Sequence, residues 1–377
     1  MAAGGDDRRA RGGLFGSLCA RRRPEGGPQA DSHGAGGMPP SPLLHLFALD
    51  RHQLCKVRPN TLEVYRKHVA AFHSWYVSQG YSWASLEDLD MLLVLWKNWA
   101  GPSKAAFVNA LAGVELAWPW AKGSLAWAHM VQAGWSIDAP PQHTLPRPME
   151  IALVFSACWV RSGLRRVGAF HMLQRRRGHR PRESLQLRAG DITFPRADSA
   201  RTGMEAVVIH FGVRQGTKNR RPEADVVLPS DQRSQEILYW LCDGLSPRDL
   251  LAGPFQYGTY RSHMERFATA LRMLPYRPHG PRAGYASECF VRGVPVPEIQ
   301  AQLRHNDPRS LRTYLDAVSL MNNHVQGDAA RWADAAGVVD AHWWEVLNGS
   351  AMPWAWIHEA SPISLDSVWS RPRHPRR

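Results

Sequence analysis

Six residues in the second half of the chain have types and spacings that suit chemistry on a phosphate ester. Arginine holds two phosphate oxygens at once through its forked guanidinium group, and lysine and histidine can transfer protons. A tyrosine hydroxyl can act as a nucleophile that forms a covalent intermediate. In chain order, the six candidate residues are Arg180, Lys218, His279, Arg282, His305 and Tyr314.

These residues form an ordered pattern whose separate pieces are common but whose combination is not. Its parts are Arg180 three residues before Glu183, the lysine Lys218, the H-x-x-R motif of His279 and Arg282, the pair Leu303 and His305 and, nine residues later, Tyr314. The order and the separations resemble those of the tyrosine recombinases, also called phage-type integrases. The resemblance covers residues 146–320 by motif. More loosely, it extends to residues 43–135 as the helical core-binding domain that precedes the catalytic domain in that family.

The resemblance implies a role for each residue. Tyr314 would attack a DNA phosphodiester and leave a 3′-phosphotyrosyl bond and a free 5′-hydroxyl, so that the strand can be rejoined without ATP. Arg180 and Arg282 would hold the phosphorane oxygens of the transition state. His305 would donate a further hydrogen bond, and His279 would help to accept the tyrosine proton. Such a set works without a metal ion or another cofactor.

Lys218 is the only lysine after Lys122, in a chain with 6 lysines and 40 arginines. The leaving 5′-oxygen needs a proton, which arginine cannot supply because its pKa exceeds about 12. A lysine can supply the proton once neighbouring cations, here Arg220 and Arg221, lower its pKa. The family has its general acid in a hairpin loop of this kind, and the resemblance therefore implies that role for Lys218.

Arg304 departs from the pattern, because the family usually has glycine between the leucine and the histidine. If that position needs close backbone packing, an arginine there would disturb His305. Two alternatives to a site-specific recombinase stay open, and Arg304 supports only the first of them. One is a DNA-binding protein that keeps the fold but has lost catalysis. The other is a type IB topoisomerase, which has a similar catalytic set and relaxes supercoils without a specific site.

Charge points to a polyanionic partner, with nucleic acid first and an anionic membrane surface second, and the family resemblance implies that the nucleic acid is double-stranded DNA. The 377 residues carry a net charge of +13, of which residues 146–330 supply +10.

No apolar run reaches the ~18 residues of a membrane span, and the five cysteines form no C-x-x-C pair. We therefore expect an intracellular, soluble protein, nuclear in a eukaryote, that uses no small-molecule cofactor and binds no membrane. The resemblance to the tyrosine recombinases further implies that the protein self-associates on DNA as the integrase of a mobile element.

The first half of the chain is expected to be helical. Asn60 and Glu63 have the spacing of a capping box, followed by an apolar helical face. Ser85 and Gly101 have the residue types that begin and end a second helix. Two further helical stretches are expected at 103–116 and 125–132.

The second half is expected to mix helices with one hairpin. Two β-branched runs, 206–213 and 225–228, predict a hairpin whose loop carries Lys218. Helices are expected at 149–160, 231–241 and 257–273, with three more between residues 280 and 319. The expected fold class is mainly α with a small antiparallel β-sheet (α+β), a helical core-binding domain followed by a tyrosine-recombinase-like catalytic domain. The expected segments are a disordered tail at 1–42, the helical DNA-binding domain at 43–137, a proline-rich linker at 138–148, the catalytic domain at 149–322 and a partly disordered, tryptophan-containing extension at 323–377.

Overall fold

The computed structural model describes residues 57–138, 144–195, 205–213, 222–305, 311 and 315–364. The chain divides into two compact units, Met1–Gln142 and His143–Arg377. The described part of each unit has a hydrophobic core of its own. Several predicted features lie outside the described residues, namely the tail 1–42, linker residues 139–143, Lys218, Tyr314 and the chain end 365–377.

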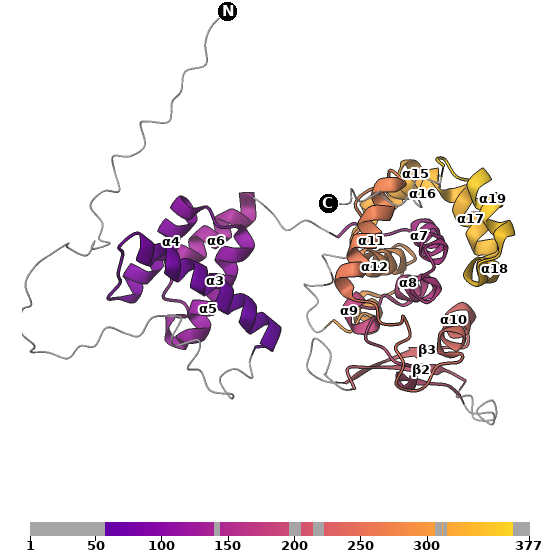
Figure 1. Ribbon diagram of the computed structural model, residues 1–377, viewed down its shortest axis with the longest axis horizontal. Helices are drawn as coiled ribbons and strands as arrows, with labels where there is room; N and C mark the ends of the chain where they lie inside the picture. The colour runs from indigo at the N-terminus through magenta and orange to yellow at the C-terminus, as the bar shows by residue number, and fades with distance from the viewer. Residues whose placement is uncertain are drawn as a thin grey trace, which may run out of the picture. The chain divides into compact units, whose positions relative to one another are not determined.

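The described part of the first unit is a bundle of helices (Figure 1). Helix α4 begins after Ser85, whose hydroxyl accepts a hydrogen bond from the N–H of Asp88, while the Asp88 carboxylate accepts one from the N–H of Ser85. The helix ends at Gly101, which has a left-handed φ of 58°. The start and end predicted for this helix are confirmed. The elements are α3 (Pro59–Ser78), α4 (Leu86–Ala100), α5 (Lys104–Ala117), the 3₁₀ turn η1 (Pro119–Ala121) and α6 (Ala126–Asp138).

The capping box predicted at Asn60 is wrong. Helix α3 starts earlier, at Pro59, and its N-cap is Arg58, which makes no side-chain capping bond. Proline is favoured in the first turn of a helix because that turn leaves its N–H groups without helical partners. Glu63 lies within the helix and pairs with Arg66 at 2.9 Å on its surface.

One buried carboxylate joins two helices of this unit. Asp90 on α4 is 2% exposed, and its two oxygens accept hydrogen bonds from the N–H groups of Trp127 at 2.9 Å and Ala128 at 2.8 Å. These bonds satisfy N–H groups in the first turn of α6 and compensate the cost of burying the charge. The surrounding core includes Val69, Phe72, Leu93, Trp96, Phe107, Leu111 and Trp118.

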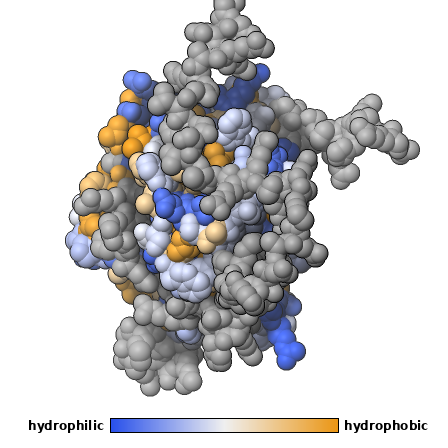
Figure 2. Space-filling view, turned by 90° about the vertical axis from the view of Figure 1, so that its left-hand side faces the viewer, coloured by the Kyte–Doolittle hydropathy of each residue, from blue (hydrophilic) through white to orange (hydrophobic). Residues whose placement is uncertain are grey.

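Large apolar side chains also lie on the surface of the first unit. They include Trp99, Trp120, Trp127, Met130 and Ile137. The side of the structure drawn in Figure 2 shows hydrophobic groups scattered between polar ones. In the described part of the chain, no helix combines the length and the apolar character that crossing a membrane requires.

The second unit is organised around the neighbouring helices α7 (Met149–Arg161) and α8 (Arg165–Arg177). Every residue of α7 from Ile151 to Val160 is buried, as expected for a helix covered on all sides. Helices α10, α12, α17 and α18 pack against this pair (Figure 1). Further elements are α9 (Pro181–Ser184), η2 (Ala189–Asp191), α10 (Gln232–Cys242), α11 (Tyr257–Ala270), α12 (Gly280–Val291), α13 (Val296–Gln302), α15 (Ala317–Gln326), α16 (Asp328–Arg331), α17 (Ala333–Ala341), α18 (Trp343–Asn348) and α19 (Ala351–Glu359).

Three antiparallel strands in the order β1-β2-β3 form the sheet of this unit. They are β1 (Ile192–Thr193), β2 (Val207–Phe211) and β3 (Glu223–Val227). Alternate residues of β2 are fully buried and pack into the core, which is the period of two expected of a half-buried strand. Phe211 and Glu223 form the last pair of the β2–β3 hairpin. The predicted hairpin and the predicted α+β fold class are confirmed.

The tryptophan-rich stretch near the end of the chain is helical, although its sequence shows poor helical periodicity. Trp332, Trp343 and Trp354 are buried in the core of the second unit. Helix α17 packs against α7, and α18 packs against both α7 and α8 (Figure 1). The described residues of this stretch therefore complete the core around the central helix pair.

Candidate functional site

Arg180 lies in a tight connection between α8 and α9. Helix α8 ends at Gly178, which has a φ of 65°, and a Cβ there would come within 2.5 Å of the Leu303 side chain. Pro181 then begins α9 directly after Arg180. Because Glu183 follows one turn later, Nη1 of Arg180 donates to its Oε1 at 3.1 Å. The spacing of three residues between this arginine and this glutamate thus produces an ion pair.

Arg282 joins the same connection from the first turn of α12. Its side chain is 1% exposed, so the guanidinium must find acceptors within the protein. Nη1 donates to the carbonyl oxygen of Gly178 at 2.6 Å, and Nη2 donates to that of Leu303. Arg282 therefore holds together the end of α8 and the end of α13, which are far apart in sequence.

The turn after α13 carries His305. Its N–H donates to the carbonyl oxygen of Gln300 at 3.0 Å, and Nε2 of Gln300 donates to the His305 carbonyl oxygen at 3.0 Å. Nη2 of Arg180 donates to the carbonyl oxygen of Arg304 at 2.8 Å. Two of the predicted arginines thus converge on residues 303–304, immediately before the half-buried His305.

His279 is the residue before α12, one turn ahead of Arg282. Its carbonyl oxygen accepts the N–H of Ala283 at 3.1 Å, and its side chain is half-buried. The carbonyl oxygen of the next residue, Gly280, accepts a hydrogen bond of 3.0 Å from the N–H of Arg147. Arg147, near the end of the expected linker, is therefore bonded directly to the turn that contains the H-x-x-R motif.

Arg304 occupies the position where glycine was expected, and it adopts the left-handed conformation that glycine favours, with a φ of 54°. Its Nη2 lies 3.2 Å from Oε2 of Glu183, and its Nη1 lies 3.5 Å from Oε2 of Glu223. Its guanidinium carbon is 3.8 Å from the centroid of the Phe211 ring. Burial lowers the pKa of Arg304, and the charge of Glu183 opposes that shift.

Asp225 is the centre of a buried network that the sequence analysis missed. Its carboxylate accepts hydrogen bonds from Nε2 of His179 at 2.7 Å, Nη2 of Arg177 at 2.7 Å and Nε2 of Gln302 at 2.8 Å. Burial by itself would raise the pKa of Asp225, but the hydrogen bonds from His179 and Arg177, together with the positive charge of Arg177, outweigh burial and hold that pKa well below its usual value. Burial lowers the pKa of His179. The network therefore joins β3, the end of α8 and α13.

A signal for Asp225 does exist in the sequence. In the strand Glu223–Val227, Asp225 alternates with Val227 on the inward face. An acidic residue at an inward position needs partners, because a buried charge is costly without them. Arg177 and His179, in contrast, could not have been recognised as those partners, because nearly fifty residues separate them from Asp225.

Comparison with solved structures identifies the fold formed by these two units. The integrase of the Tn1549 transposon, in complex with transposon right end DNA, aligns over 76% of this chain and 99% of its own, with a TM-score of 0.50 and 13% sequence identity. The chain has the fold of a tyrosine recombinase. The likeness concerns the fold alone, because the sequence identity is low.

Two other recombinases align with lower scores. XerA recombinase aligns over 76% of this chain and 97% of its own, with a TM-score of 0.34 and 15% identity. The site-specific recombinase XerH, bound to palindromic difH substrate, aligns over 75% of this chain and 80% of its own, with a TM-score of 0.41 and 15% identity. No protein-family model matches the chain, and no curated protein sequence matches it significantly.

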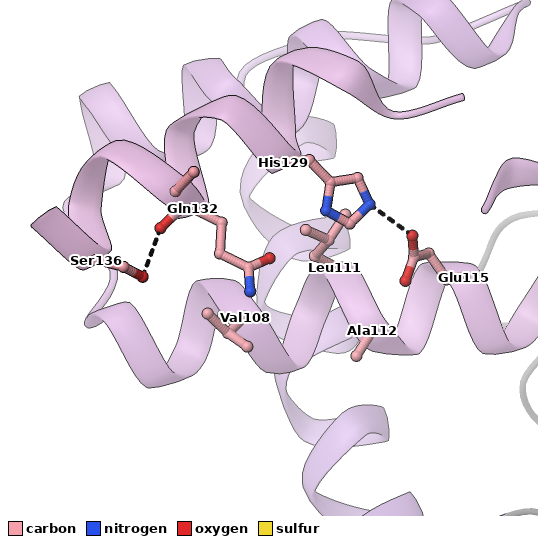
Figure 3. A pocket seen from close by; sticks show the side chains of 8 residues that line it. Val108, Leu111, Ala112, Glu115, His129, Gln132 and Ser136 are labelled. Carbon is pink, nitrogen blue, oxygen red and sulfur yellow. Dashed lines mark hydrogen bonds and ion pairs between the residues drawn. The ribbon is translucent and has the colours of Figure 1, made fainter. Parts of the chain in front are cut away.

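The helical unit of this tyrosine-recombinase fold also has a surface hollow between α5 and α6 (Figure 3). Nε2 of His129 lies 2.8 Å from Oε1 of Glu115 at one side of it, and the hydroxyl of Ser136 donates to the carbonyl oxygen of Gln132 at 2.8 Å. The hollow contains none of the six predicted site residues. Within the described ranges, no group of three or more histidine, cysteine or acidic side chains is arranged to hold a metal ion.

Proposed function

We propose that this protein cleaves and rejoins DNA strands through a 3′-phosphotyrosyl intermediate on Tyr314. One observation carries the proposal: Arg180 and Arg282 donate to the carbonyl oxygens of Arg304 and Leu303, directly before His305. Arg180 and Arg282, which lie far apart in sequence, therefore bind the same short segment next to His305. The tyrosine-recombinase fold supports the same conclusion.

The roles follow from the chemistry of each side chain. The Arg180 guanidinium has five N–H donors, so its bonds to Glu183 and Arg304 leave donors for phosphate oxygens. His305 supplies a further hydrogen bond, and His279 accepts the proton of Tyr314 as the phenol attacks. A phenol has a pKa near ~10, so positive charge around Tyr314 is needed to favour its ionised form.

Lys218 protonates the leaving 5′-oxygen in this mechanism. The hairpin that carries its loop is fixed to the rest of the site through Asp225 and Glu223 on β3. We further propose that copies of the chain self-associate on double-stranded DNA, with the site-specific reaction serving the integration of a mobile element. In this proposal the helical DNA-binding domain at 43–137 and the catalytic domain at 149–322 both bind the duplex, and the catalytic domain also cleaves it.

Covalent capture tests the central step and does not require a known target site. The full chain is incubated with a pool of nicked duplexes whose central segment is randomised, and covalent complexes are isolated under denaturing conditions. Protease digestion and mass spectrometry should locate the attached nucleotide on Tyr314, and sequencing of the DNA should reveal the preferred site. Tyr314→Phe should give no covalent complex.

The same experiment separates the two alternatives. A protein that keeps the fold without catalysis would retain DNA but form no covalent complex. A topoisomerase would form the complex on many sequences and relax a supercoiled plasmid without giving recombinant products. Addition of EDTA should leave the covalent yield unchanged, because the proposed residues supply the positive charge that a metal ion would otherwise provide.

A further inference from the structure

One side chain, that of Arg304, contacts both strands at the base of the hairpin that carries Lys218. Phe211 ends β2 and Glu223 begins β3, and these two residues pair directly across the hairpin. The Arg304 guanidinium lies 3.8 Å from the Phe211 ring centroid, and its Nη1 lies 3.5 Å from Oε2 of Glu223. Arg304 therefore contacts both strands at the last pair before the loop 214–221.

The same side chain reaches the partners of Arg180. Nη2 of Arg304 donates to Oε2 of Glu183 at 3.2 Å, while Nη1 of Arg180 donates to Oε1 of that carboxylate at 3.1 Å. Nη1 of Arg180 also lies 3.8 Å from Oε2 of Glu223. The two arginines and the two glutamates form a compact cluster whose formal charges balance. This balance offsets the cost of burying all four groups.

The backbone at Arg304 indicates that side-chain contacts hold it there. A residue with a Cβ is disfavoured in the left-handed region, yet Arg304 has a φ of 54°. Its side chain is 7% exposed and lies between Glu183, Glu223 and Phe211. Arg272, with a φ of 52°, is the other non-glycine residue at positive φ in the described ranges, and its side chain is exposed.

We propose that Arg304 is a positioning residue that clamps the base of the hairpin, Phe211 and Glu223, to the segment holding Arg180 and His305. The inference rests on the proposed function for its catalytic consequence. Arginine suits this task because one planar group can stack on a ring and bridge two carboxylates at its edge. Glycine, which the family resemblance predicts here, would make the backbone turn without forming the clamp.

Hydrogen–deuterium exchange on the full chain without DNA tests the clamp independently of activity. Arg304→Gly relieves the backbone and removes the guanidinium, so amides in peptides spanning residues 205–227 should exchange at least tenfold faster, while those of α7 stay unchanged. Glu223→Gln should act in the same direction without altering the backbone at position 304. Arg272→Gly is the matched control and should leave the hairpin unchanged. Unchanged hairpin exchange in both Arg304→Gly and Glu223→Gln, or an equal rise throughout the second unit, would overturn the proposal.

A leaving-group experiment tests the link to Lys218. The substrate is the duplex recovered by covalent capture, made with either oxygen or sulfur at the 5′-bridging position, because sulfur departs without needing a proton. Arg304→Gly should cleave the oxygen substrate at least tenfold more slowly than the parent protein and recover most of that loss with sulfur. Arg272→Gly should match the parent protein on both substrates.

The outcomes distinguish the two proposals. If the parent protein gives no covalent complex with any duplex in the pool, the proposed function fails, and the exchange experiment still decides whether the clamp exists. If Arg304→Gly is equally slow with oxygen and sulfur, Arg304 does not act through Lys218. Cleavage by Arg304→Gly at the parental rate would show that the arginine is dispensable for catalysis and would overturn the positioning role.

Discussion

The carbonyl oxygen of Arg304 accepts a hydrogen bond of 2.8 Å from Nη2 of Arg180. This bond places the connection between α8 and α9 beside the turn that carries His305. Arg180 thus serves the proposed site in two ways, by presenting its remaining donors to a phosphate and by supporting the histidine turn. A lysine could supply the charge at this position, but it could not reach Glu183 and Arg304 with the same planar fork.

Arg180→Lys should therefore retain DNA binding but lose cleavage. We expect the dissociation constant for DNA to change less than about threefold and the single-turnover cleavage rate to fall roughly 10²–10³-fold, the range found when one transition-state donor is removed. Arg182→Lys is the matched control, since Arg182 is exposed and stacks on Tyr257. Equal losses in the two variants would contradict a specific role for Arg180.

Lys218→Arg should bind DNA like the parent protein and cleave it poorly, because the charge is kept while the transferable proton is lost. General-acid catalysis contributes about 10²–10⁴ in rate, which sets the size of the expected defect. A sulfur leaving group should restore cleavage to this variant but not to Arg180→Ala. Equal rescue of both, or of neither, would make Lys218 a phosphate contact instead of the acid.

DNA affinity should fall steeply with salt, and most of the slope should arise from residues 146–330, which carry most of the excess charge. The slope of log K for DNA binding against log salt concentration is negative, and each lost phosphate contact reduces its steepness by roughly 0.9. The measurement is a titration of the full chain with a random-sequence duplex at several salt concentrations. The double variant Arg220→Gln/Arg221→Gln should make the salt dependence less steep than Lys67→Gln/Lys97→Gln in the first unit does. A larger effect of the Lys67→Gln/Lys97→Gln variant would contradict the expectation that residues 146–330 make most of the phosphate contacts.

The buried network around Asp225 should make stability depend on pH in two ranges. The pKa of His179 is lowered by burial, so the unfolded chain takes up a proton below about pH 6.5 that the folded protein does not, and stability falls as the pH drops from 7 to 5. The pKa of Asp225 is lowered in the folded state, so its contribution is present above about pH 4 and is lost below that value.

Urea unfolding at several pH values measures both effects. His179→Gln should flatten the decline between pH 7 and 5, which for one site cannot exceed about 1.4 kcal/mol per pH unit. Asp225→Asn should be less stable than the parent protein at pH 7, with a difference that shrinks below about pH 4. A constant difference across the whole range would mean that ionisation of Asp225 is not what stabilises the network.

Gly284→Ala should destabilise the second unit. A Cβ at this position would overlap the carbonyl oxygen of Arg147, which is bonded to Nε of Arg175, so neither backbone can move freely. We expect a loss of roughly 2 kcal/mol or more. Gly258→Ala on α11 is the control: a Cβ there meets nothing within 4 Å, and alanine favours a helix by about 1 kcal/mol over glycine. Thermal unfolding of the two variants should therefore shift in opposite directions.

The sequence by itself determined the elements whose causes are local. Ser85 and Gly101 begin and end α4 through bonds and dihedral angles within a few residues, and the β-branched runs around the loop of Lys218 pair as a hairpin. The error at Asn60 has a local cause as well, because Pro59 is a good first residue and leaves the capping box unused. The order of the six site residues was also readable, since it depends only on spacing.

Only the tertiary structure decided which parts of the chain the described site residues contact. Arg180 contacts Arg304 across 124 positions, and Arg282 contacts Gly178 across 104, and no periodicity in the sequence encodes such distances. The contacts of Arg304 were equally hidden in the sequence, where this residue looked like a departure from the family pattern that would disturb His305. Its left-handed backbone and its pairing with Glu183 and Glu223 arise because α9, β3 and the turn after α13 are packed together. A side chain's role depends on the charges and rings that surround it, and folding alone assembles those surroundings.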